Sequence, residues 1–374
     1  MNAPIDRISL FLPELHAGGA QQFTLDLARC WAGEGRSVHL VCASATGRLR
    51  EAVPDGVELI DLKTERVVRT PTLLIAYLRQ HPGRACWSFM THMNLAVVLA
   101  SRVLSRHQGP VAVHEVARFD AGRDPSAPLR RTAMRGGIRW LYRHADIIAA
   151  VSEDVADDVA RVGSINRSRV DVMSNAIDVE RIRSAAAAPN DHPWFADSSV
   201  PVLLAVGRLA PEKDYETLFR AFALLRAKRP LRLIVVGEGP SESALNRLAE
   251  SLGIAGDVDL VGFQANPFAY MGRADLLVLS SFSEGFGLVI VEAMACGTNV
   301  VVTDCGTGPR AILPADFGPL PPTRDPQALA ASIEERLRAL LSSDVLIGYA
   351  QRLDIKAAAA IFLDRLATAP RRRV

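Results

Sequence analysis

Short apolar segments alternate with amphipathic, helix-like segments along almost the whole chain of 374 residues. In the first half, strand-like runs such as Ile5–Phe11, Val38–Ala43 and Val111–Val116 are separated by helix-like runs such as Gln21–Gly33. This alternation is typical of parallel sheets covered by helices, because parallel neighbours need a long crossover connection. A second series begins at Val202–Val206. We therefore predict two doubly wound α/β domains.

A change of composition between the two series marks the expected domain boundary. Residues 184–199 combine an alanine run with proline, asparagine, aspartate and serine, as a connection between domains does. The chain is also too long for one ordinary core and fits two domains of roughly 150–200 residues. We expect an N-terminal domain over residues 1–188, a linker over 189–199, and a second domain from residue 200.

The bulk composition is that of a soluble globular enzyme, with 49% hydrophobic and 22% charged residues. The apolar runs are strand-sized, and none approaches the roughly 20 residues of a membrane span. Residues 1–7 lack the basic start and the apolar run of a signal peptide. The five cysteines form no CxxC pair, which favours buried thiols in a reducing compartment. We therefore expect a cytoplasmic protein.

Positive charge is concentrated in the first half, although the net charge is only +2. Residues 66–143 contain 13 arginines and 3 acidic residues, a local net charge of +10. Within them Arg131, Arg135 and Arg139 recur every fourth residue between apolar residues, as in a basic amphipathic helix. The stretch 118–143 therefore suits an anionic membrane surface or a phosphorylated acceptor, and an ordinary solvated helix face is the alternative. We expect no nucleic-acid partner.

The segment from Ser280 to Gly297 carries the strongest functional signal. Two carboxylates, Glu284 and Glu292, stand eight positions apart, and a Gly-Phe-Gly turn lies between them. A glycine turn that opens a helix presents free backbone N–H groups to an anion. Glu292 would lie just over one turn inside that helix, where its carboxylate can accept hydrogen bonds from a vicinal diol such as a ribose. The alternative is a flexible turn before a core helix with two solvated glutamates.

Two cations follow the first strand of the second domain. Arg208 and Lys213 stand at the carboxyl end of Val202–Val206, where a bound pyrophosphate needs compensating charge. Hydrogen bonds to charged groups contribute roughly 1.5–3 kcal/mol each, against about 0.3–1 kcal/mol for an exposed helix dipole. The two cations should therefore dominate phosphate affinity. Two unrelated surface cations in a loop are the alternative.

The first domain carries weaker signals. Gly18 and Gly19 follow its first strand, where glycine lets the backbone approach a phosphate closely, although many turns need glycine for other reasons. His92 and His114 stand at the ends of two apolar strands, and we expect both side chains to point toward the ligand. The alternative for a lone histidine is a structural hydrogen-bonding role.

Two further patterns are better explained by local structure. Residues 236–240, Val-Gly-Glu-Gly-Pro, look like the start of a dinucleotide fingerprint, but Glu242 replaces the third glycine and a proline interrupts the turn. NAD binding is therefore not expected. Residues 257–259 spell the Asp-x-Asp of metal-dependent sugar transferases, but they follow Gly256 and begin a strand. We interpret them as turn chemistry and expect no metal and no other cofactor.

Taken together, these segments resemble family 4 of the retaining glycosyltransferases, which have the GT-B fold. The resemblance implies two Rossmann-like domains facing across a cleft, with a nucleotide-sugar donor held mainly by the second. It also implies a C-terminal helix that crosses back to the first domain, so the donor domain would cover 200–346 and the crossing segment 347–374. The matching pieces are Gly18-Gly19, His114, Ser152, Asn175–Asp178, Gly207-Arg208, Glu212-Lys213, Gly237–Pro240, Gly262-Phe263, Glu284–Gly287, Glu292 and Gly297.

The resemblance implies roles for residues of the second domain. Arg208 and Lys213 would bind the donor diphosphate and stabilise the leaving nucleotide. Glu292 would hold the ribose hydroxyls. Glu284 and the turn that follows it would contact the sugar and the phosphates. The residues of that turn are Gly285, Phe286, Gly287 and Leu288.

Further implied contacts involve both domains. Gly18 and Gly19 would approach the diphosphate from the first domain, and His114 would lie near the transferred sugar. Gly262 and Phe263 would flank the base.

Three positions depart from the family pattern. Ala176 replaces a common glycine, Glu115 follows His114 where glycine or aspartate is frequent, and Arg310 stands where glutamate is common. The last change puts sugar or phosphate contacts there in doubt, but not the reaction class.

The implied reaction is transfer of a sugar, with retention, from a nucleoside diphosphate sugar, and we expect a UDP-sugar. A double displacement would need a carboxylate nucleophile about 5 Å from an acid partner, and the sequence identifies none. The family implies a front-face route in which the departing diphosphate deprotonates the acceptor. We expect a lipid-linked or glycan acceptor in polysaccharide, lipopolysaccharide or glycolipid biosynthesis, and an enzyme peripheral on the inner face of the membrane.

Three other functions stay open. One is a soluble transferase with a small acceptor, giving a sucrose-, trehalose- or inositol-type product. Another is a nucleotide-sugar-binding protein without turnover, which the intact Arg208, Lys213, Glu284 and Glu292 argue against. A nicotinamide dehydrogenase is disfavoured by the broken glycine fingerprint.

Overall fold

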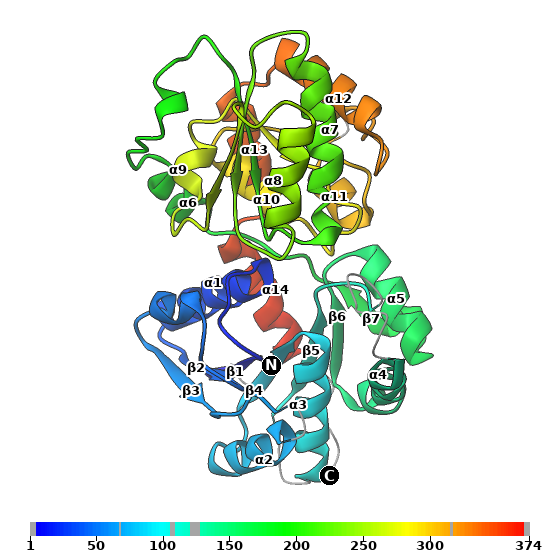
Figure 1. The fold of residues 1–374 in the computed structure, drawn as a ribbon. Helices are drawn as coiled ribbons and strands as arrows, with labels where there is room; N and C mark the ends of the chain where they lie inside the picture. Colours follow the sequence, from blue (N-terminus) through cyan, green and yellow to red (C-terminus); the bar gives the residue numbers. More distant parts are fainter. Residues whose placement is uncertain (1–4, 67–68, 105–108, 120–127, 315–316, 370–374) are drawn as a thin grey trace. The chain divides into compact units, whose positions relative to one another are not determined.

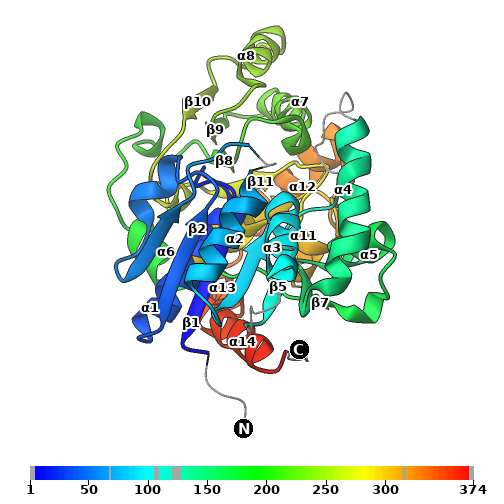
Figure 2. The same ribbon diagram turned by 90° about the horizontal axis from the view of Figure 1, so that it is seen from below.

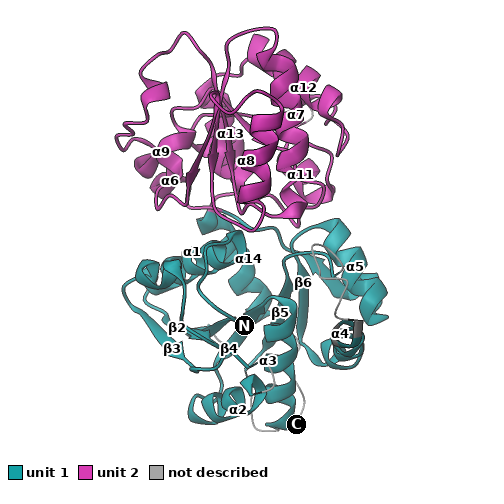
Figure 3. Ribbon diagram, viewed as in Figure 1, with its two compact units in different colours: residues 1–176, 355–374 teal, residues 177–354 magenta. Residues whose placement is uncertain are grey.

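The computed structural model describes residues 5–66, 69–104, 109–119, 128–314 and 317–369. Residues 120–127, which belong to the predicted basic stretch, lie outside this described part. The chain divides into two compact units (Figures 1 and 3). Unit 1 comprises residues 1–176 and 355–374, and unit 2 comprises residues 177–354. Each is a parallel sheet with helices on its faces, as the alternation predicts.

Unit 1 is built on a seven-stranded sheet in the order β3-β2-β1-β4-β5-β6-β7, with every neighbouring pair parallel. The strand order reverses between β1 and β4, and ligands of such sheets bind outside the carboxyl ends of the strands at this point. The strands are β1 (Arg7–Leu12), β2 (Ser37–Cys42), β3 (Val57–Asp61), β4 (Ala85–Phe89), β5 (Val111–Glu115), β6 (Ile147–Ala150) and β7 (Val170–Val172).

The helices of unit 1 cover both faces of its sheet (Figure 2). Helix α1 packs on α14, whereas α2, α3, α4 and α5 pack on one another in succession. Right-handed crossovers explain these two groups, because the chain moves in opposite directions along the sheet before and after β3. The helices are α1 (Gly19–Gly33), α2 (Thr70–Gln80), α3 (Thr91–Val103), α4 (Pro128–Leu141), α5 (Glu153–Gly163), α14 (Ile355–Ala367), and the 3₁₀ helices η1 (Arg48–Ala52), η2 (Tyr142–His144) and η3 (Arg167–Arg169).

Unit 2 is built on a five-stranded parallel sheet in the order β10-β9-β8-β11-β12. Helices α7, α8 and α12 pack together, as do α6, α9, α10 and α13. The strands are β8 (Val202–Val206), β9 (Arg232–Val236), β10 (Val258–Gly262), β11 (Leu276–Leu279) and β12 (Asn299–Val302). The helices are α6 (Val179–Ala186), α7 (Tyr215–Arg226), α8 (Glu242–Ser251), α9 (Phe268–Met271), α10 (Leu288–Ala295), α11 (Thr307–Ile312), α12 (Pro326–Arg338), α13 (Ser343–Gln351), and the 3₁₀ helices η4 (Pro193–Phe195) and η5 (Pro211–Lys213).

The first passage between the units lies earlier than the composition suggests. Unit 2 begins at Ile177, so residues 177–188 belong to it, and their helix α6 packs against α9 and α10. The expected linker 189–199 also folds onto unit 2. His192 Nε2 lies 3.1 Å from a carboxylate oxygen of Asp259, and the Arg232 guanidinium lies 5.6 Å from the centre of the Trp194 ring. Aromatic groups therefore anchor a segment whose alanine and proline content resembles a free connection.

The C-terminal stretch from residue 347 also divides differently from the expectation. Helix α13 stays in unit 2, where it packs against α10, and the chain enters unit 1 only at Ile355. Helix α14 is held there by Trp31, whose indole N–H donates to the Ala359 carbonyl oxygen (3.2 Å), and by an ion pair of 2.6 Å between Arg365 and Asp171. The stretch from Ile355 onward, which begins with α14, rather than all of 347–374, therefore belongs with the first sheet.

Candidate functional site

The loop after β8 positions the two predicted cations. Gly207 has a φ of +153°, which favours glycine, and its carbonyl oxygen accepts a hydrogen bond from the Tyr215 hydroxyl (3.0 Å). Burial raises the pKa of Tyr215, so this hydroxyl stays a neutral donor. The chain then forms η5, which ends at Lys213. Asp214 follows and caps α7 by accepting hydrogen bonds from the N–H (3.3 Å) and hydroxyl (2.7 Å) of Thr217.

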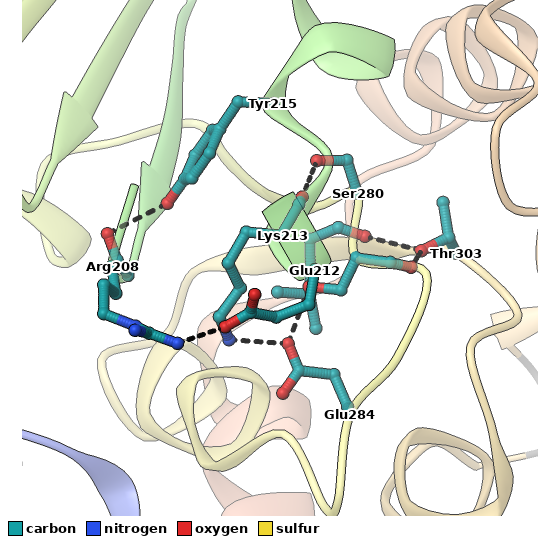
Figure 4. A network of polar contacts seen from close by, with 10 residues as sticks. Arg208, Glu212, Lys213, Tyr215, Ser280, Glu284 and Thr303 are labelled. Atoms are coloured by element: carbon teal, nitrogen blue, oxygen red, sulfur yellow. Dashed lines mark hydrogen bonds and ion pairs between the residues drawn. The ribbon is translucent and has the colours of Figure 1, made fainter. Parts of the chain in front are cut away.

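Lys213 meets the predicted carboxylate motif (Figure 4). Its ammonium lies 2.7 Å from Oε1 of Glu284, and the same oxygen accepts a hydrogen bond from the Ser281 hydroxyl (2.6 Å). The Lys213 and Glu284 side chains are only 21% and 12% exposed, so solvent screens this pair less than a surface pair. The Ser280 hydroxyl donates to the Lys213 carbonyl oxygen (2.8 Å). The ends of β8 and β11 are thereby tied together.

Arg208 lies on the same carboxyl edge of the sheet but faces solvent. Its guanidinium forms an ion pair with Glu212, and its side chain is 66% exposed. The Phe282 N–H donates to the Glu212 carbonyl oxygen (3.0 Å), which fixes the loop against the segment that follows β11. An anion arriving from solvent can therefore reach this guanidinium and exchange for the Glu212 carboxylate.

The glycine turn before α10 is built as the sequence predicts. Gly287 has a φ of +96°, and α10 begins at the next residue. A side chain at Gly308 would put its Cβ 2.5 Å from the Gly285 carbonyl oxygen and 2.7 Å from Phe286 Cα, so the first turn of α11 lies directly against this turn. The free N–H groups at the start of α10 are therefore held in place beside the Lys213–Glu284 pair.

Glu292 lies one turn into α10 and is half-buried. The pKa of the neighbouring Cys296 thiol is raised to about 12, mainly by burial and further by the Glu292 charge. Burial and the Glu284 charge likewise raise the pKa of Cys305 to about 12. Both thiols stay protonated at neutral pH, so neither is an activated nucleophile.

Arg310, which departs from the family pattern, is engaged in an ion pair. Its Nε lies 2.6 Å from a carboxylate oxygen of Asp304, and its side chain remains largely exposed. This arrangement places another cation beside the glycine turn, on a helix whose first turn contacts it.

The Gly-Glu-Gly segment after β9 has a packing role. A Cβ at Gly237 would lie 2.0 Å from the Gly207 carbonyl oxygen, and one at Gly239 would lie 2.3 Å from that of Leu209. These glycines let two loops pass backbone against backbone, which explains the incomplete dinucleotide fingerprint.

Gly262 is the last residue of β10, at the outer edge of the same sheet, and Phe263 follows it. Gly262 has a φ of +70°, and its carbonyl oxygen accepts a hydrogen bond from the Gly237 N–H (2.9 Å). They share the carboxyl edge with Arg208 but are two strands away from it.

The predicted residues of the first domain lie in unit 1. Gly18 and Gly19 are at the start of α1. His114 is fully buried, and its ring stacks between Phe89 and Phe362 with centroid distances of 5.3 and 5.6 Å. Desolvation lowers its pKa to about 3. The expectation that His114 faces the ligand is therefore corrected, because its place on β5 directs the side chain to the face that α14 covers.

The Asp-x-Asp segment also has a structural role. Asp257 forms an ion pair with Arg226 (2.8 Å), and Asp259 contacts His192. Within the described residues, no group of three or more His, Cys, Asp or Glu side chains is placed to hold a metal ion. Sequence reasoning missed Ser281, although its position three residues before Glu284 is a spacing that brings hydroxyl and carboxylate together.

Comparison with known proteins identifies the family. Residues 190–352 match the family model described as glycosyl transferases group 1, and residues 18–176 match that of a glycosyl transferase 4-like domain. A D-inositol 3-phosphate glycosyltransferase of Rhodococcus jostii is 30% identical over 321 residues, which cover 78% of this chain and 70% of that protein. The chain belongs to the group 1 glycosyltransferases.

Another relative is similar over part of its length, and solved structures share the fold. The N-acetylgalactosamine-N,N'-diacetylbacillosaminyl-diphospho-undecaprenol 4-alpha-N-acetylgalactosaminyltransferase of Campylobacter jejuni is 34% identical over 184 residues, about half the length of this relative (48% of each chain). The structure of Anabaena HepE with UDP and glucose has a TM-score of 0.79 at 20% identity, covering 97% of this chain and 99% of that chain. For WaaG, a glycosyltransferase involved in lipopolysaccharide biosynthesis, the TM-score is 0.70 at 18% identity, with 96% and 100% covered. The expected GT-B fold of this group 1 member is thereby confirmed.

Proposed function

We propose that this group 1 glycosyltransferase transfers a sugar, with retention, from a UDP-sugar to a lipid-linked or glycan acceptor. The observation that carries the proposal is the meeting of Lys213 and Glu284 at the glycine turn that opens α10. A cation, a carboxylate and free helix N–H groups together match the charges and hydroxyls of a nucleoside diphosphate sugar. The HepE structures that contain UDP or UDP-glucose support this donor class by analogy of fold.

Each donor group has a partner in unit 2. The diphosphate takes Lys213, Arg208 and the N–H groups at the start of α10. Glu284, held by Ser281, accepts hydrogen bonds from sugar hydroxyls, and Glu292 accepts those of the ribose. Gly262 and Phe263, at the edge of the sheet, flank the base.

The chemistry requires no protein nucleophile. The bond between the anomeric carbon and the diphosphate oxygen breaks, and the acceptor oxygen bonds to that carbon on the same face. The acceptor proton passes to an oxygen of the departing diphosphate. Lys213 and Arg208 stabilise the charge that grows on this leaving group, which is where positioned cations accelerate a reaction most.

Nucleotide release from UDP-, GDP- and ADP-sugars, with membrane extract as the acceptor source and mass spectrometry of the products, tests the proposal. We expect release from a UDP-sugar, and we expect it to persist in EDTA. A strict requirement for Mg²⁺ or Mn²⁺ would contradict the metal-free mechanism. Donor binding without release under every condition would instead indicate a binding protein.

Helix α4 supports placing the enzyme on an anionic membrane surface in polysaccharide, lipopolysaccharide or glycolipid assembly. Ile138 and Leu141 are buried against unit 1, whereas Leu129 and Trp140 are 86% and 51% exposed. Exposed arginines at 131, 135 and 139 accompany them. An apolar and basic outer face is what an interfacial helix presents to anionic lipid. In the described part of the chain, no helix is long and apolar enough to span a bilayer.

Vesicle sedimentation tests this placement. We expect binding to phosphatidylglycerol vesicles at low salt, little binding to phosphatidylcholine, and loss of binding in the triple variant R131Q/R135Q/R139Q. The control R183Q/R247Q/R273Q removes three exposed arginines from unit 2. Equal loss in both variants, or no binding at low salt, would refute a specific role for α4.

A further inference from the structure

Unit 1 contains a cavity of about 340 Å³ at the carboxyl edge of its sheet. Its walls come from the segments after β1, β2 and β3 and from the first turns of α2 and α3, around the point where the strand order reverses. The volume lies in the range of small-ligand pockets, which begins at about 300 Å³. The lining residues are Pro13, Glu14, His16, Ala43, Ser44, Thr46, Thr64, Glu65, Thr70, His92 and Met93.

The walls of this cavity are ordered by backbone contacts. The Leu15 N–H donates to the Thr46 carbonyl oxygen (2.9 Å), and the Ser44 N–H donates to that of Pro13 (3.0 Å). Gly47 has a φ of +121°, and a Cβ there would lie 2.3 Å from the Leu15 backbone. These contacts hold the segments after β1 and β2 together, so the cavity is formed in the absence of a ligand.

The lining combines hydroxyls and carboxylates with a small apolar area. Ser44, Thr46, Thr64 and Thr70 contribute hydroxyls, and the Ser44 and Thr46 oxygens lie 3.1 Å apart. Glu14 and Glu65 contribute carboxylates, and His16 and His92 contribute imidazoles. Hydroxyls donate and accept, and carboxylates only accept, which matches the mixed donors and acceptors of a polyol. Pro13, Ala43 and Met93 offer apolar contact to the C–H face of a ring.

The same lining disfavours an anion. None of the described residues that line the cavity is Lys or Arg, and two are carboxylates. Arg66 is not a lining residue, and its backbone N–H donates to the Thr64 hydroxyl (3.2 Å) while its carbonyl oxygen accepts from the Thr70 hydroxyl (3.4 Å). The Arg50 guanidinium, also outside the lining, donates to the Ala45 carbonyl oxygen (3.3 Å). A phosphate in the cavity would face these two carboxylates, and none of the described lining residues would offer it a lysine or arginine side chain. The carboxylates and imidazoles also form no metal cluster among the described side chains.

We infer that this cavity binds the acceptor and that it takes a hydroxyl-rich sugar ring without a phosphate or carboxylate group. This inference rests on the proposed function, and it distinguishes between the kinds of acceptor that the relatives' names suggest. Phosphorylated polyols, such as the inositol 3-phosphate of the Rhodococcus jostii protein's name, are excluded. A neutral terminal sugar of a longer glycan is accepted.

Transfer to paired probes tests the inference. The neutral probes are myo-inositol and the octyl glycosides of glucose, galactose, N-acetylglucosamine and N-acetylgalactosamine, and the charged probes are inositol 3-phosphate and glucose 6-phosphate. With the donor found active in the release assay, we expect transfer to at least one octyl glycoside and none to either phosphate. Saturation-transfer NMR measures binding of the same probes in the absence of turnover.

Two substitutions in the lining localise the effect. Glu14→Gln removes a carboxylate that can accept hydrogen bonds from sugar hydroxyls. We expect the KM of the neutral acceptor substrate to rise about tenfold, the scale of a hydrogen bond to a charged group. Glu65→Lys places a cation in the exposed part of the wall, and we expect it to weaken the neutral acceptor and to permit binding of inositol 3-phosphate. Glu51→Lys, on exposed η1 outside the cavity, is the matched control.

The outcomes separate this inference from the proposed function. UDP affinity measures unit 2 and should be unchanged in all three variants. Preference of the wild-type protein for a phosphorylated probe would overturn the inference. The inference would also be overturned if Glu14→Gln and Glu65→Lys both left the KM of the acceptor substrate within twofold of the wild-type value. Absence of NMR binding for every neutral probe would overturn it as well. Loss of UDP binding by the wild-type protein would instead refute the proposed function itself.

Discussion

The two units share one design but present opposite charge at the edge where ligands bind. In unit 2, Arg208 and Lys213 stand at the carboxyl end of β8. In unit 1, the corresponding edge holds a cavity with Glu14 and Glu65 in its lining. Parallel sheets place their loops alike, so the difference lies in the side chains that follow each strand. In the proposed function, the fold sets the edge at which each ligand binds, and these few charges select the ligand.

The cores of the units differ as well. Seven of the eight histidines belong to the sequence of unit 1, and two of them, His39 and His114, are buried with lowered pKa values of about 4 and 3. Arg84 is also buried there and donates to the Ile8 and Ser37 carbonyl oxygens (2.6 and 2.7 Å). The core cluster of unit 2 around Phe219 is apolar. We therefore expect acid to lower the free energy of unfolding of unit 1 and to leave that of unit 2 unchanged.

Truncation of Phe362 should separate the stabilities of the two units. This fully buried ring of α14 packs against Phe23, Trp87 and His114, so Phe362→Ala should reduce the free energy of unfolding of unit 1 by about 3–5 kcal/mol. Hydrogen exchange should accelerate in β1–β7 and stay slow in β8–β12. Ile361→Ala, at the exposed neighbouring position, is the control and should change neither. Equal acceleration in both sheets would show that the units unfold together.

Removal of the Lys213 ammonium should test the function proposed for unit 2 separately from that proposed for unit 1. Lys213→Ala should lower kcat/KM by about 10²-fold or more, because a positioned charge near the leaving group is lost and the Glu284 carboxylate is left without its cation. The melting temperature should change little, since the lysine lies at the sheet edge. Lys228→Ala, an exposed lysine of unit 2, serves as the control. Wild-type rates in Lys213→Ala would refute the donor assignment.

Acid should weaken unit 1 first. A histidine whose folded pKa is lowered contributes full stability above its unfolded pKa of about 6.5 and loses it as pH falls toward the folded value. For His114 this amounts to about 2 kcal/mol at pH 5, and His39 adds to the same direction. The protection factors of β1–β7, which are corrected for the intrinsically slower amide exchange in acid, should therefore fall between pH 6.5 and 5 before those of β8–β12. His114→Phe should flatten this dependence, and an unchanged pH profile would exclude His114 as its source.

Neutralisation of Glu292 should have the smallest effect. If this carboxylate binds the ribose, Glu292→Gln should weaken UDP binding about tenfold in calorimetry, the cost of one charged hydrogen bond. Binding of a free sugar should not change. Glu250→Gln on exposed α8 is the matched control. An unaltered UDP affinity would remove Glu292 from the nucleotide site.

Much of the fold was predictable where glycine and apolar runs coincide. Strand β8 has in the structure the bounds of the predicted run Val202–Val206, and α10 begins directly after the glycine turn that was predicted to open a helix. Strand β3 (Val57–Asp61) was missed, because its side chains are only partly buried and form no long apolar run. The helical character of the stretch that contains Arg131, Arg135 and Arg139 was predicted from their spacing.

The site was predictable in its composition but not in its contacts. The sequence places Arg208, Lys213 and Glu284 after strands, yet it contains no strand order, so it cannot show that β8 neighbours β11 and that Lys213 meets Glu284. For His114 the error is the reverse, because a contact with the ligand was expected and the side chain is buried instead. A position near the end of a strand does not tell which face of the sheet the side chain joins, and the covering helix comes from the other end of the chain.

The chain passes out of unit 1 and back into it at two points that are bonded to each other. The Ile177 N–H donates to the Leu353 carbonyl oxygen (3.0 Å), and Ile177 forms a parallel bridge with Asp354. Unit 2 is therefore an insertion whose two ends meet, inside a domain that is completed only by its last helix. During synthesis unit 2 can fold while its host still lacks α14, so unit 1 obtains its complete set of packed elements only after unit 2 has been made.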